Sequence, residues 1–343
     1  MKEFVDFRIP EERAKQYLEP QDGTTLGGTV RKLVLSVDDP RYDKIGKLER
    51  KFLRDGQPFF LGWQIKRHYA KKELEAAEIF NLDINAVFEP SGEECGTEYN
   101  ASEACLICGA GRKQVSDLIL DLRKVPKSKE IAQTIADEWI VSQRLAELLI
   151  DSGMTGFELR STRHKAHYRD APIDPYLTPT GREIMHLAKE AGFKTTDWDF
   201  YVWLNRPEQR HLLERESEEF IQLMERRNLH RSKLMPVWYQ LIITSEPIQT
   251  IPPTLFGNNP FDEDPEGEYR CPLGHVSGLN LLSEIWVSKD SWDGSDIVRT
   301  QDLVGIRRGV LVPRPLLLIS SRMWQLLTME KIKGYKIEIA HLA

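Results

Sequence analysis

Two short cysteine motifs lie far apart in the chain, Cys105-Leu-Ile-Cys108-Gly109 and Cys271-Pro-Leu-Gly-His275. Thiolates with two residues between them, on a tight turn that ends in glycine, can both bind one tetrahedral metal ion. If the two motifs share one ion, that ion joins segments from two distant parts of the sequence. The fold must then bring both turns to the same place.

Five side chains compete for four ligand positions. They are Cys95, Cys105, Cys108, Cys271 and His275. Cys105 and Cys108 come first, because a Cys-x-x-Cys-Gly turn directs both sulfurs inward. Cys271 precedes a proline, as in many zinc motifs. Cys95, in Glu94-Cys95-Gly96, lies ten residues before Cys105, and its segment could fold back toward that cysteine. His275 lies at a slightly long spacing that the reach of an imidazole accommodates. We predict a structural zinc held by four of these five.

A catalytic zinc would need an open position beside a general base. The sequence contains no His-Glu-x-x-His and no deaminase-type His-x-Glu with Cys-x-x-Cys. The alternative for Cys105 and Cys108 is a redox dithiol, which usually lies between a strand and a helix, whereas here a strand-like segment follows the motif. We therefore predict no catalytic residues. A metal-dependent hydrolase with an open zinc position remains an alternative.

The composition is that of an ordinary globular protein, with 343 residues, 41% of them hydrophobic and 29% charged. Four cysteines are too few for a disulfide scaffold, and their spacing indicates thiolates in a reducing compartment. The chain contains no signal-peptide core and no apolar stretch of ~18 residues. We expect a cytoplasmic protein without a membrane partner. Because the net charge is −6 and nucleic-acid binders usually have a basic excess, we do not expect a nucleic-acid partner.

The chain also resembles itself. When residue 139 is set against residue 317, the two segments match without gaps as far as 163 and 341: Ser142 meets Ser320, Arg144 meets Arg322 and Gly156 meets Gly334. Each segment predicts a strand, a helix capped by the serine, a turn relieved by the glycine, and a second strand. When Gly111 is set against Gly278, Cys108 meets His275. The two cysteine motifs are then equivalent.

These patterns predict an α+β fold of two related halves, each a mostly antiparallel sheet with a packed helix and a zinc motif. The expected domains are an N-terminal half over 1–165, a helical insertion or linker over 166–235, and a C-terminal half over 236–343. Residues 70–80, rich in Ala, Glu, Lys and Leu, predict a helix. The oligomeric state is left open.

Several of these segments resemble one known family. They are Cys105–Gly109, Asp293-Gly-Ser-Asp-Ile297, Ile319-Ser-Ser-Arg322 and Lys333-Gly-Tyr335, with Ile140–Arg144 and Thr155–Phe157 repeating the last two. The chain resembles the double-CxxCG immunity proteins of bacterial polymorphic toxin systems, including Myxococcus-type immunity proteins. The resemblance covers about half of the chain. The chain differs from the family at the second motif, which is Cys-x-x-Gly-His instead of Cys-x-x-Cys-Gly, and over residues 166–235, which do not match it.

The resemblance implies a cytosolic, non-enzymatic protein that binds and neutralises a cognate protein toxin, and it carries over no catalytic residues. Because Cys-x-x-Cys ribbons also occur in nucleic-acid readers, a zinc-ribbon regulatory or nucleic-acid-associated protein is the second hypothesis. Its binding would weaken steeply with salt.

Overall fold

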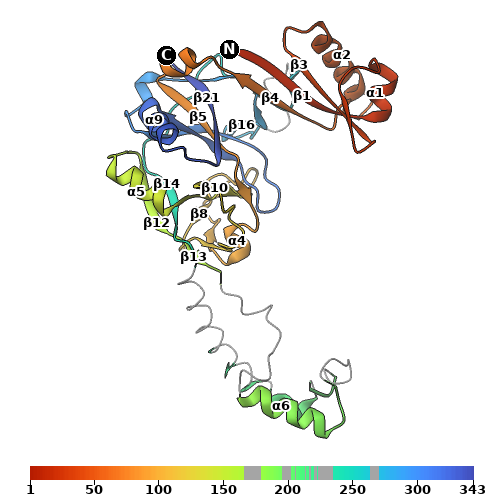
Figure 1. Cartoon of the computed structure of the whole chain (residues 1–343), viewed down its shortest axis with the longest axis vertical. Coiled ribbons are helices and arrows are strands. Elements are labelled where there is room, and N and C mark those ends of the chain that lie inside the picture. Colours follow the sequence, from red (N-terminus) through yellow and green to blue (C-terminus); the bar gives the residue numbers. More distant parts are fainter. Residues whose placement is uncertain are drawn as a thin grey trace.

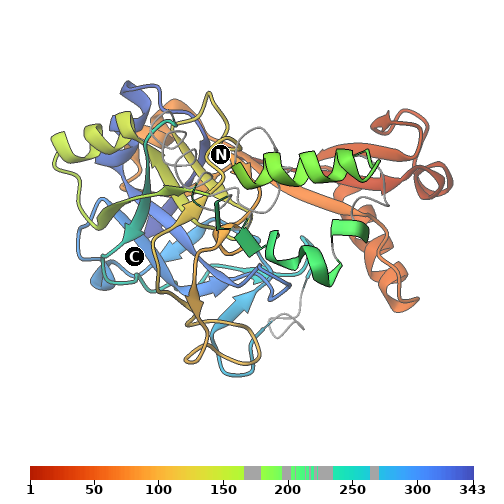
Figure 2. The same cartoon turned by 90° about the horizontal axis from the view of Figure 1, so that it is seen from below.

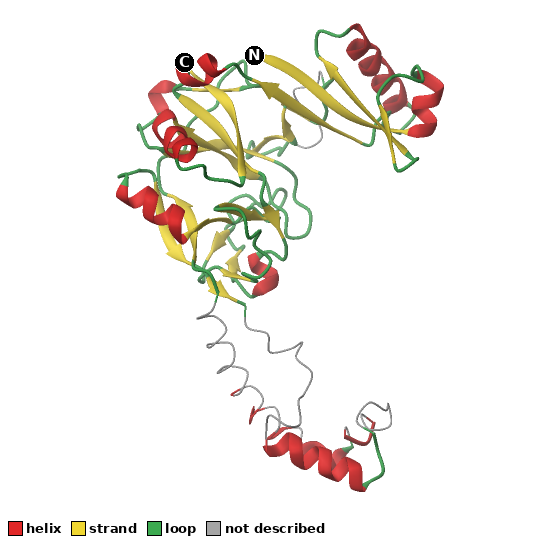
Figure 3. Cartoon of the chain, in the orientation of Figure 1, coloured by secondary structure: helices red, strands yellow, loops and turns green. Residues whose placement is uncertain are grey.

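The computed structural model describes residues 1–165, 179–194, 202–204, 206–212, 214–215, 218–219, 222, 235–262 and 270–343. These residues form a mixed α+β protein with several sheets (Figure 1, Figure 3). Most of the predicted insertion over 166–235 lies outside the described residues. Within it, α6 (Pro179–Glu190) and η1 (Pro207–Gln209) are described. Among the described helices, none has the length and apolar character needed to span a membrane.

The first 68 residues form an antiparallel sheet with its own core, which stands to one side of the other sheets (Figure 2). Its strand order is β2 (Thr24–Leu26), β3 (Val30–Ser36), β1 (Lys2–Pro10), β4 (Gly62–His68). Val5, Phe7 and Ile9 alternate along β1 and are fully buried, as one covered sheet face requires. The covering helices are α1 (Glu11–Tyr17) and α2 (Pro40–Arg54).

Two larger sheets form the centre of the molecule. The five-stranded sheet has the order β12 (Phe157–Ser161), β14 (Trp238–Ile243), β11 (Trp139–Ser142), β10 (Ile131–Thr134), β6 (Val87–Phe88). The six-stranded sheet has the order β16 (Val276–Gly278), β19 (Ile297–Val304), β20 (Arg314–Ser320), β5 (Ile79–Ile84), β21 (Tyr335–Leu342), β18 (Ile285–Val287). The helix α5 (Gln143–Asp151) connects β11 to β12 in the first sheet, and α9 (Ser321–Met329) connects β20 to β21 in the second.

Each central sheet contains one strand from the other part of the chain. β14 follows β12 in sequence but lies between β11 and β12, whereas β5 precedes β6 but lies between β20 and β21. The registers agree at the positions that the sequence comparison aligned. Ser142 pairs with Trp238 and Ser320 pairs with Ile79, while Phe157 pairs with Ile243 and Tyr335 with Ile84.

The turn glycines have matching contacts, with the strand of their own sheet that comes from the other part of the chain and with the backbone of the opposite sheet. The Gly156 carbonyl accepts from the amides of Thr244 and Ser245, and the Gly334 carbonyl accepts from those of Asn85 and Ala86. Both glycines have positive φ, +92° at Gly156 and +121° at Gly334. A Cβ at either would clash with a carbonyl oxygen, of Ile297 or of Ile131 respectively.

One hydrophobic core joins both sheets and both helices. It contains Phe80, Leu82 and Ile84 of β5, Leu145 and Leu149 of α5, Leu241 and Ile243 of β14, and Met323 and Leu327 of α9. The serines predicted to cap the helices do so: Ser142 accepts from the Leu145 amide and Ser320 from the Met323 amide. Burial of this shared face is the main favourable term holding the two sheets together.

The helix predicted over 70–80 is shorter than expected. It is α3 (Lys71–Ala76), and Ile79 already begins β5. The prediction is wrong for the last residues because Ile79 and Phe80 are fully buried between β20 and β21. Pairing with two neighbouring strands outweighs a weak helix propensity.

Short elements complete the described chain. They are α4 (Gly92–Cys95), η2 (Lys289–Ser291), and the strand pairs β7 (Tyr99–Asn100) with β8 (Lys113–Gln114), β9 (Ile119–Leu120) with β13 (Arg163–His164), and β15 (Phe256–Gly257) with β17 (Asn280–Leu281). The cysteine motifs lie in the β7–β8 connection and before β16.

Candidate metal centre

Four of the five predicted ligands meet at one point. The ligand atoms of Cys105, Cys108, Cys271 and His275 all lie within 4.8 Å of one another. His275 Nδ1 is 3.7 Å from the sulfurs of both Cys108 and Cys271. A tetrahedral zinc with ordinary Zn–S and Zn–N bonds places sulfur and nitrogen about 3.6 Å apart. The group therefore has the size and donor set that a metal such as zinc requires.

The first motif is shaped by its own backbone. The Cys105 amide donates to the Ala110 carbonyl at 2.7 Å, and the Gly109 amide donates to the Cys105 carbonyl at 2.8 Å. Gly109 has φ +79°, a conformation that glycine adopts without strain. The Cys108 amide donates to the Cys105 sulfur, and this bond, with smaller contributions from the Ile107 amide and from His275, lowers the pKa of the Cys105 thiol to about 6. The turn thus favours the thiolate, which is the form that binds metal.

The second motif forms a similar turn with a different fourth position. The Gly274 amide donates to the Cys271 carbonyl at 2.8 Å, and the Cys271 amide donates to the Val276 carbonyl at 3.4 Å. Gly274 has φ +81°. Cys271 is buried, while His275 remains exposed beside it. The imidazole is longer than a cysteine side chain, so His275 reaches the cluster from the surface. In the first motif the matching position is Cys108, which is buried.

The six-stranded sheet supports both motifs. Val276, which follows the second motif, pairs with Leu303 at the end of β19. The connection from β19 to β20 holds the first motif, because Arg307 donates to the Leu106 carbonyl at 2.7 Å. A Cβ at Gly109 would lie 3.2 Å from Val312 of the same connection. Both turns are therefore positioned by one end of one hairpin.

The charges around the group suit three thiolates. A Zn²⁺ ion with three thiolates carries a net negative charge. Arg270 and Arg307 line the surface depression that includes Cys108 and Cys271. Burial raises the pKa of the Cys108 thiol to about 11, so its thiolate needs a nearby positive charge. A metal ion would supply that charge.

Cys95 is the candidate that the structure does not bring to the group. It is buried at the end of α4, where its amide donates to the Ser91 carbonyl. Burial raises the pKa of its thiol, consistent with a neutral packed side chain. Gly96 then turns the chain into the left-handed region at φ +107° and toward β7. Cys95 thus fills a place in the fold instead of turning back to Cys105.

The arrangement can close a tetrahedral site with protein atoms alone. Three cysteines and one histidine occupy all four positions, and soft sulfur with imidazole favours zinc among common metals. In such a site the ion contributes to folding instead of activating a water.

Comparisons of the chain with protein-family models, with curated proteins and with solved structures give no significant match. The resemblance to the double-CxxCG immunity proteins therefore stays a prediction.

Sequence reasoning missed one further polar site. Asn81 and Asp83 of β5 line a cavity on the face of the six-stranded sheet opposite the shared core. The signal was available in Ile79-Phe-Asn-Leu-Asp-Ile84, where polar residues alternate with apolar ones. Such alternation indicates a strand with one face outside the core.

Proposed function

We propose that this protein is a non-enzymatic binding protein stabilised by a Cys3His zinc, and that it neutralises a cognate bacterial toxin by direct contact. The observation that carries the proposal is the four-ligand group with exposed apolar side chains on both of its turns. Four protein ligands leave no position for the activated water of a zinc hydrolase. The toxin itself comes from the family resemblance.

Three large apolar side chains project from the two turns. Leu106 is 90% exposed and Ile107 56% exposed between the first two cysteines, and Leu273 is 65% exposed in the second motif. Because they lie between ligands that meet at one point, a bound ion would hold them close together and fixed. Exposed apolar groups gathered in this way are typical of protein interfaces. We call Leu106, Ile107 and Leu273 the apolar tips.

The charge of the chain suits a basic partner. A net charge of −6 would speed encounter with a positively charged toxin such as a nuclease. Steric covering of the toxin's active site is the simplest means of neutralisation, because it requires no chemistry from this chain.

The test is co-expression with the products of adjacent genes. We expect the wild-type chain to restore growth in the presence of one such toxin and to copurify with it. The double variant Leu106→Ser, Leu273→Ser should bind at least about tenfold more weakly. The matched control is Leu255→Ser, another exposed leucine at 61% exposure, which should bind as the wild type does. No binding to any neighbouring toxin would contradict the proposal.

Two other functions predict different results. A zinc-ribbon regulatory or nucleic-acid-associated protein would bind nucleic acid with an affinity that falls steeply with salt. A metal-dependent hydrolase would have three protein ligands and an oxygen ligand on its zinc. The first is measured by titration of labelled DNA and RNA at two salt concentrations, and the second by the coordination shell of the metal.

We further propose that the two central sheets are copies of one duplicated unit that exchange a strand. The support is the shared register and the matching turn contacts at Gly156 and Gly334. A chain cut within 166–234 tests this proposal. The fragments 1–165 and 235–343 should associate when co-expressed, since each sheet needs a strand from the other fragment. Independent folding of each fragment alone would contradict the exchange.

A further inference from the structure

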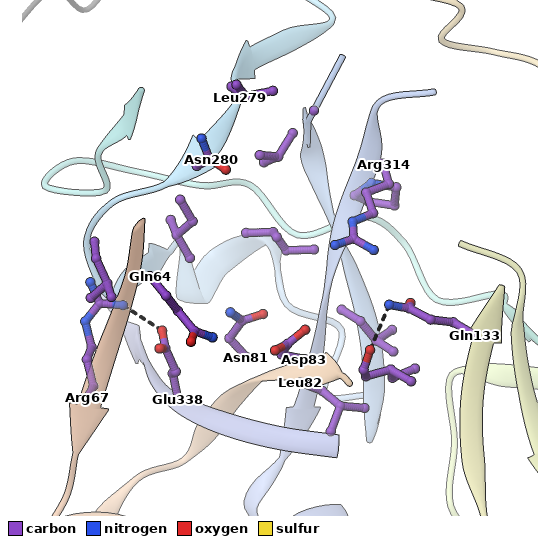
Figure 4. A pocket seen from close by; sticks show the side chains of 18 of the residues that line it. Gln64, Arg67, Asn81, Leu82, Asp83, Gln133, Leu279, Asn280, Arg314 and Glu338 are labelled. Carbon is purple, nitrogen blue, oxygen red and sulfur yellow. Dashed lines mark hydrogen bonds and ion pairs between the residues drawn. The ribbon is translucent and has the colours of Figure 1, made fainter. Parts of the chain in front are cut away.

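A cavity of about 400 Å³ lies between the N-terminal sheet and the six-stranded sheet. β4 forms one side, β5 and β21 form the floor, and the residues around Asn280 close another side (Figure 4). The volume falls within the range of roughly 300–1,000 Å³ that is common for small-molecule sites. Trp63 and Trp139 are among its lining residues.

Several polar groups in the cavity already have partners. Arg67 donates to Glu3, to Glu338 and to the Leu282 carbonyl. Arg314 forms an ion pair with Asp137. The Gln133 side chain donates to the Ile84 carbonyl at 2.8 Å. These contacts hold the walls in place and leave the two arginines neutralised.

Asn81 differs from these groups. The residue is only 9% exposed and lines the cavity, and its side chain forms no hydrogen bond with the described part of the chain. Figure 4 shows the side chains of Asn81 and Asp83 beside each other on the cavity side of β5. The amide of Asn81 is therefore available to exchange hydrogen bonds with a ligand in the cavity.

The balance of charge favours a cation. The charged residues that line the cavity are Asp83, Glu338, Arg67 and Arg314. Their charged neighbours are Glu3 beside Arg67, Asp137 beside Arg314, Glu284 near Glu338, and Lys336, which lies opposite Asp83 in the strand register. Negative charge is therefore in excess. Burial raises the pKa of Glu338, Arg67 lowers it in part, and the neighbouring Asp83 and Glu284 raise it again. A positive ligand would lower this repulsion.

We propose that this cavity binds a small organic cation, an amine or guanidinium compound, which no part of the toxin-neutralising function requires. Asp83 receives the positive charge, while the amides of Asn81 and Gln64 accept or donate hydrogen bonds on either side. The tryptophan rings provide apolar and π surfaces that favour a cation over an anion. The ligand class follows from these groups together.

Isothermal titration of the full chain tests the proposal with three probes. Agmatine carries a guanidinium and an amine, putrescine carries two amines, and 1,4-butanediol has the putrescine skeleton without charge. We expect at least one of the two cations to bind at one site per chain with a Kd below about 1 mM. The diol should bind at least tenfold more weakly. Equal binding of the diol, or binding of neither cation, would overturn the proposal.

Variants locate the binding. Asp83→Asn keeps the shape and removes the charge, and it should weaken cation binding by about tenfold or more. Asn81→Leu removes the amide on β5 and should also weaken cation binding. If that variant fails to fold, Gln64→Leu, at an exposed position of the N-terminal sheet, still reports on the cavity. The control is Asp117→Asn, a carboxylate that is 66% exposed and distant in sequence from the cavity strands. Cation binding that is equal in Asp83→Asn, Gln64→Leu and Asp117→Asn would mean general surface attraction and would overturn the site.

Discussion

The two central sheets are alike in their backbone and different in the side chains they present. Ser142 and Ser320 hold equivalent places in register and cap equivalent helices. On β14, however, the Gln240 side chain exchanges hydrogen bonds with Gln114. The matching place on β5 is Asn81, which faces the cavity instead. Residues that shape the backbone, such as Ser142 and Ser320, are the same in both sheets. Residues such as Gln240 and Asn81, whose side chains point away from the shared core, differ.

The cysteine motifs show the same contrast. Both turns use a glycine with positive φ, Gly109 and Gly274, yet one turn ends its pair of ligands with Cys108 and the other with His275. A thiolate and an imidazole can each complete a tetrahedral zinc. The backbone of the turn is thus similar in the two motifs, while the ligand atom differs. Substitutions of the metal ligands, the turn glycines, the helix caps and the surface arginines test how far the two regions are alike.

Loss of a metal ligand should have the largest effect. Cys108→Ser removes one of four ligands, and we expect it to lower the free energy of unfolding by more than about 4 kcal/mol, as loss of a structural metal does. Urea unfolding followed by circular dichroism measures this. Cys95→Ser is the matched control, a buried cysteine outside the group, and it should cost less than about 2 kcal/mol. Equal losses in the two variants would show that no metal joins the motifs.

The turn glycines should come next, with equal effects in the two sheets. Gly156→Ala and Gly334→Ala each bring a Cβ against a carbonyl oxygen of the other sheet. We expect each to cost about 3 kcal/mol or more, because the clash adds to the cost of positive φ. Gly56→Ala is the control, with φ +75° and open space around its Cβ, and it should cost about 1–2 kcal/mol. If one of the pair behaves like Gly56, the two turns do not have equivalent roles.

The two helix caps should contribute different amounts to the free energy of unfolding. Ser142→Ala removes a single cap and should cost about 1 kcal/mol. Ser320→Ala removes a cap and also leaves buried Asp296 without the hydroxyl that donates to it at 2.7 Å. We therefore expect about 2 kcal/mol for Ser320. Denaturant unfolding of both variants in parallel checks the order, and a larger loss at Ser142 would contradict it.

The surface arginines should have the smallest effect. Arg144 donates to the Glu330 carbonyl and Arg322 to the Ser152 carbonyl, and their side chains are 50% and 55% exposed. Each alanine variant should lose less than about 1 kcal/mol, and part of this loss should disappear at high salt. Arg322 should lose slightly more, since its partner Asp296 is buried. Thermal unfolding at two salt concentrations measures both.

What the sequence predicted well was local. The Cys105–Gly109 turn, the caps at Ser142 and Ser320, and the turn glycines depend on residues within a few positions of one another, and the structure confirms the local geometry of each. The placement of β5 and β14 between strands from the other part of the chain could not be predicted in this way. It depends on which strands pair, and β5 finds its partners more than two hundred residues along the chain. Pairing at that separation leaves no local pattern.

The misjudged end of the helix over 70–80 and the open choice among five ligands have the same origin. Residues 79–80 follow a segment of strong helix formers, but their burial in the sheet decides their structure. For Cys95, sequence spacing alone left a choice of five ligands, and only the packing of α4 separates this cysteine from the others. Propensity and spacing describe what a segment can do; burial decides which option is taken.

The most direct test of the account is the metal content of the purified chain, measured by elemental analysis with zinc-edge X-ray absorption. We expect one zinc per chain with three sulfur neighbours at about 2.3 Å and one nitrogen neighbour at about 2.0 Å. Cys95→Ser should keep this stoichiometry, and Cys271→Ser should lose it. Absence of metal, or an oxygen neighbour in place of one of the four side chains, would contradict the account.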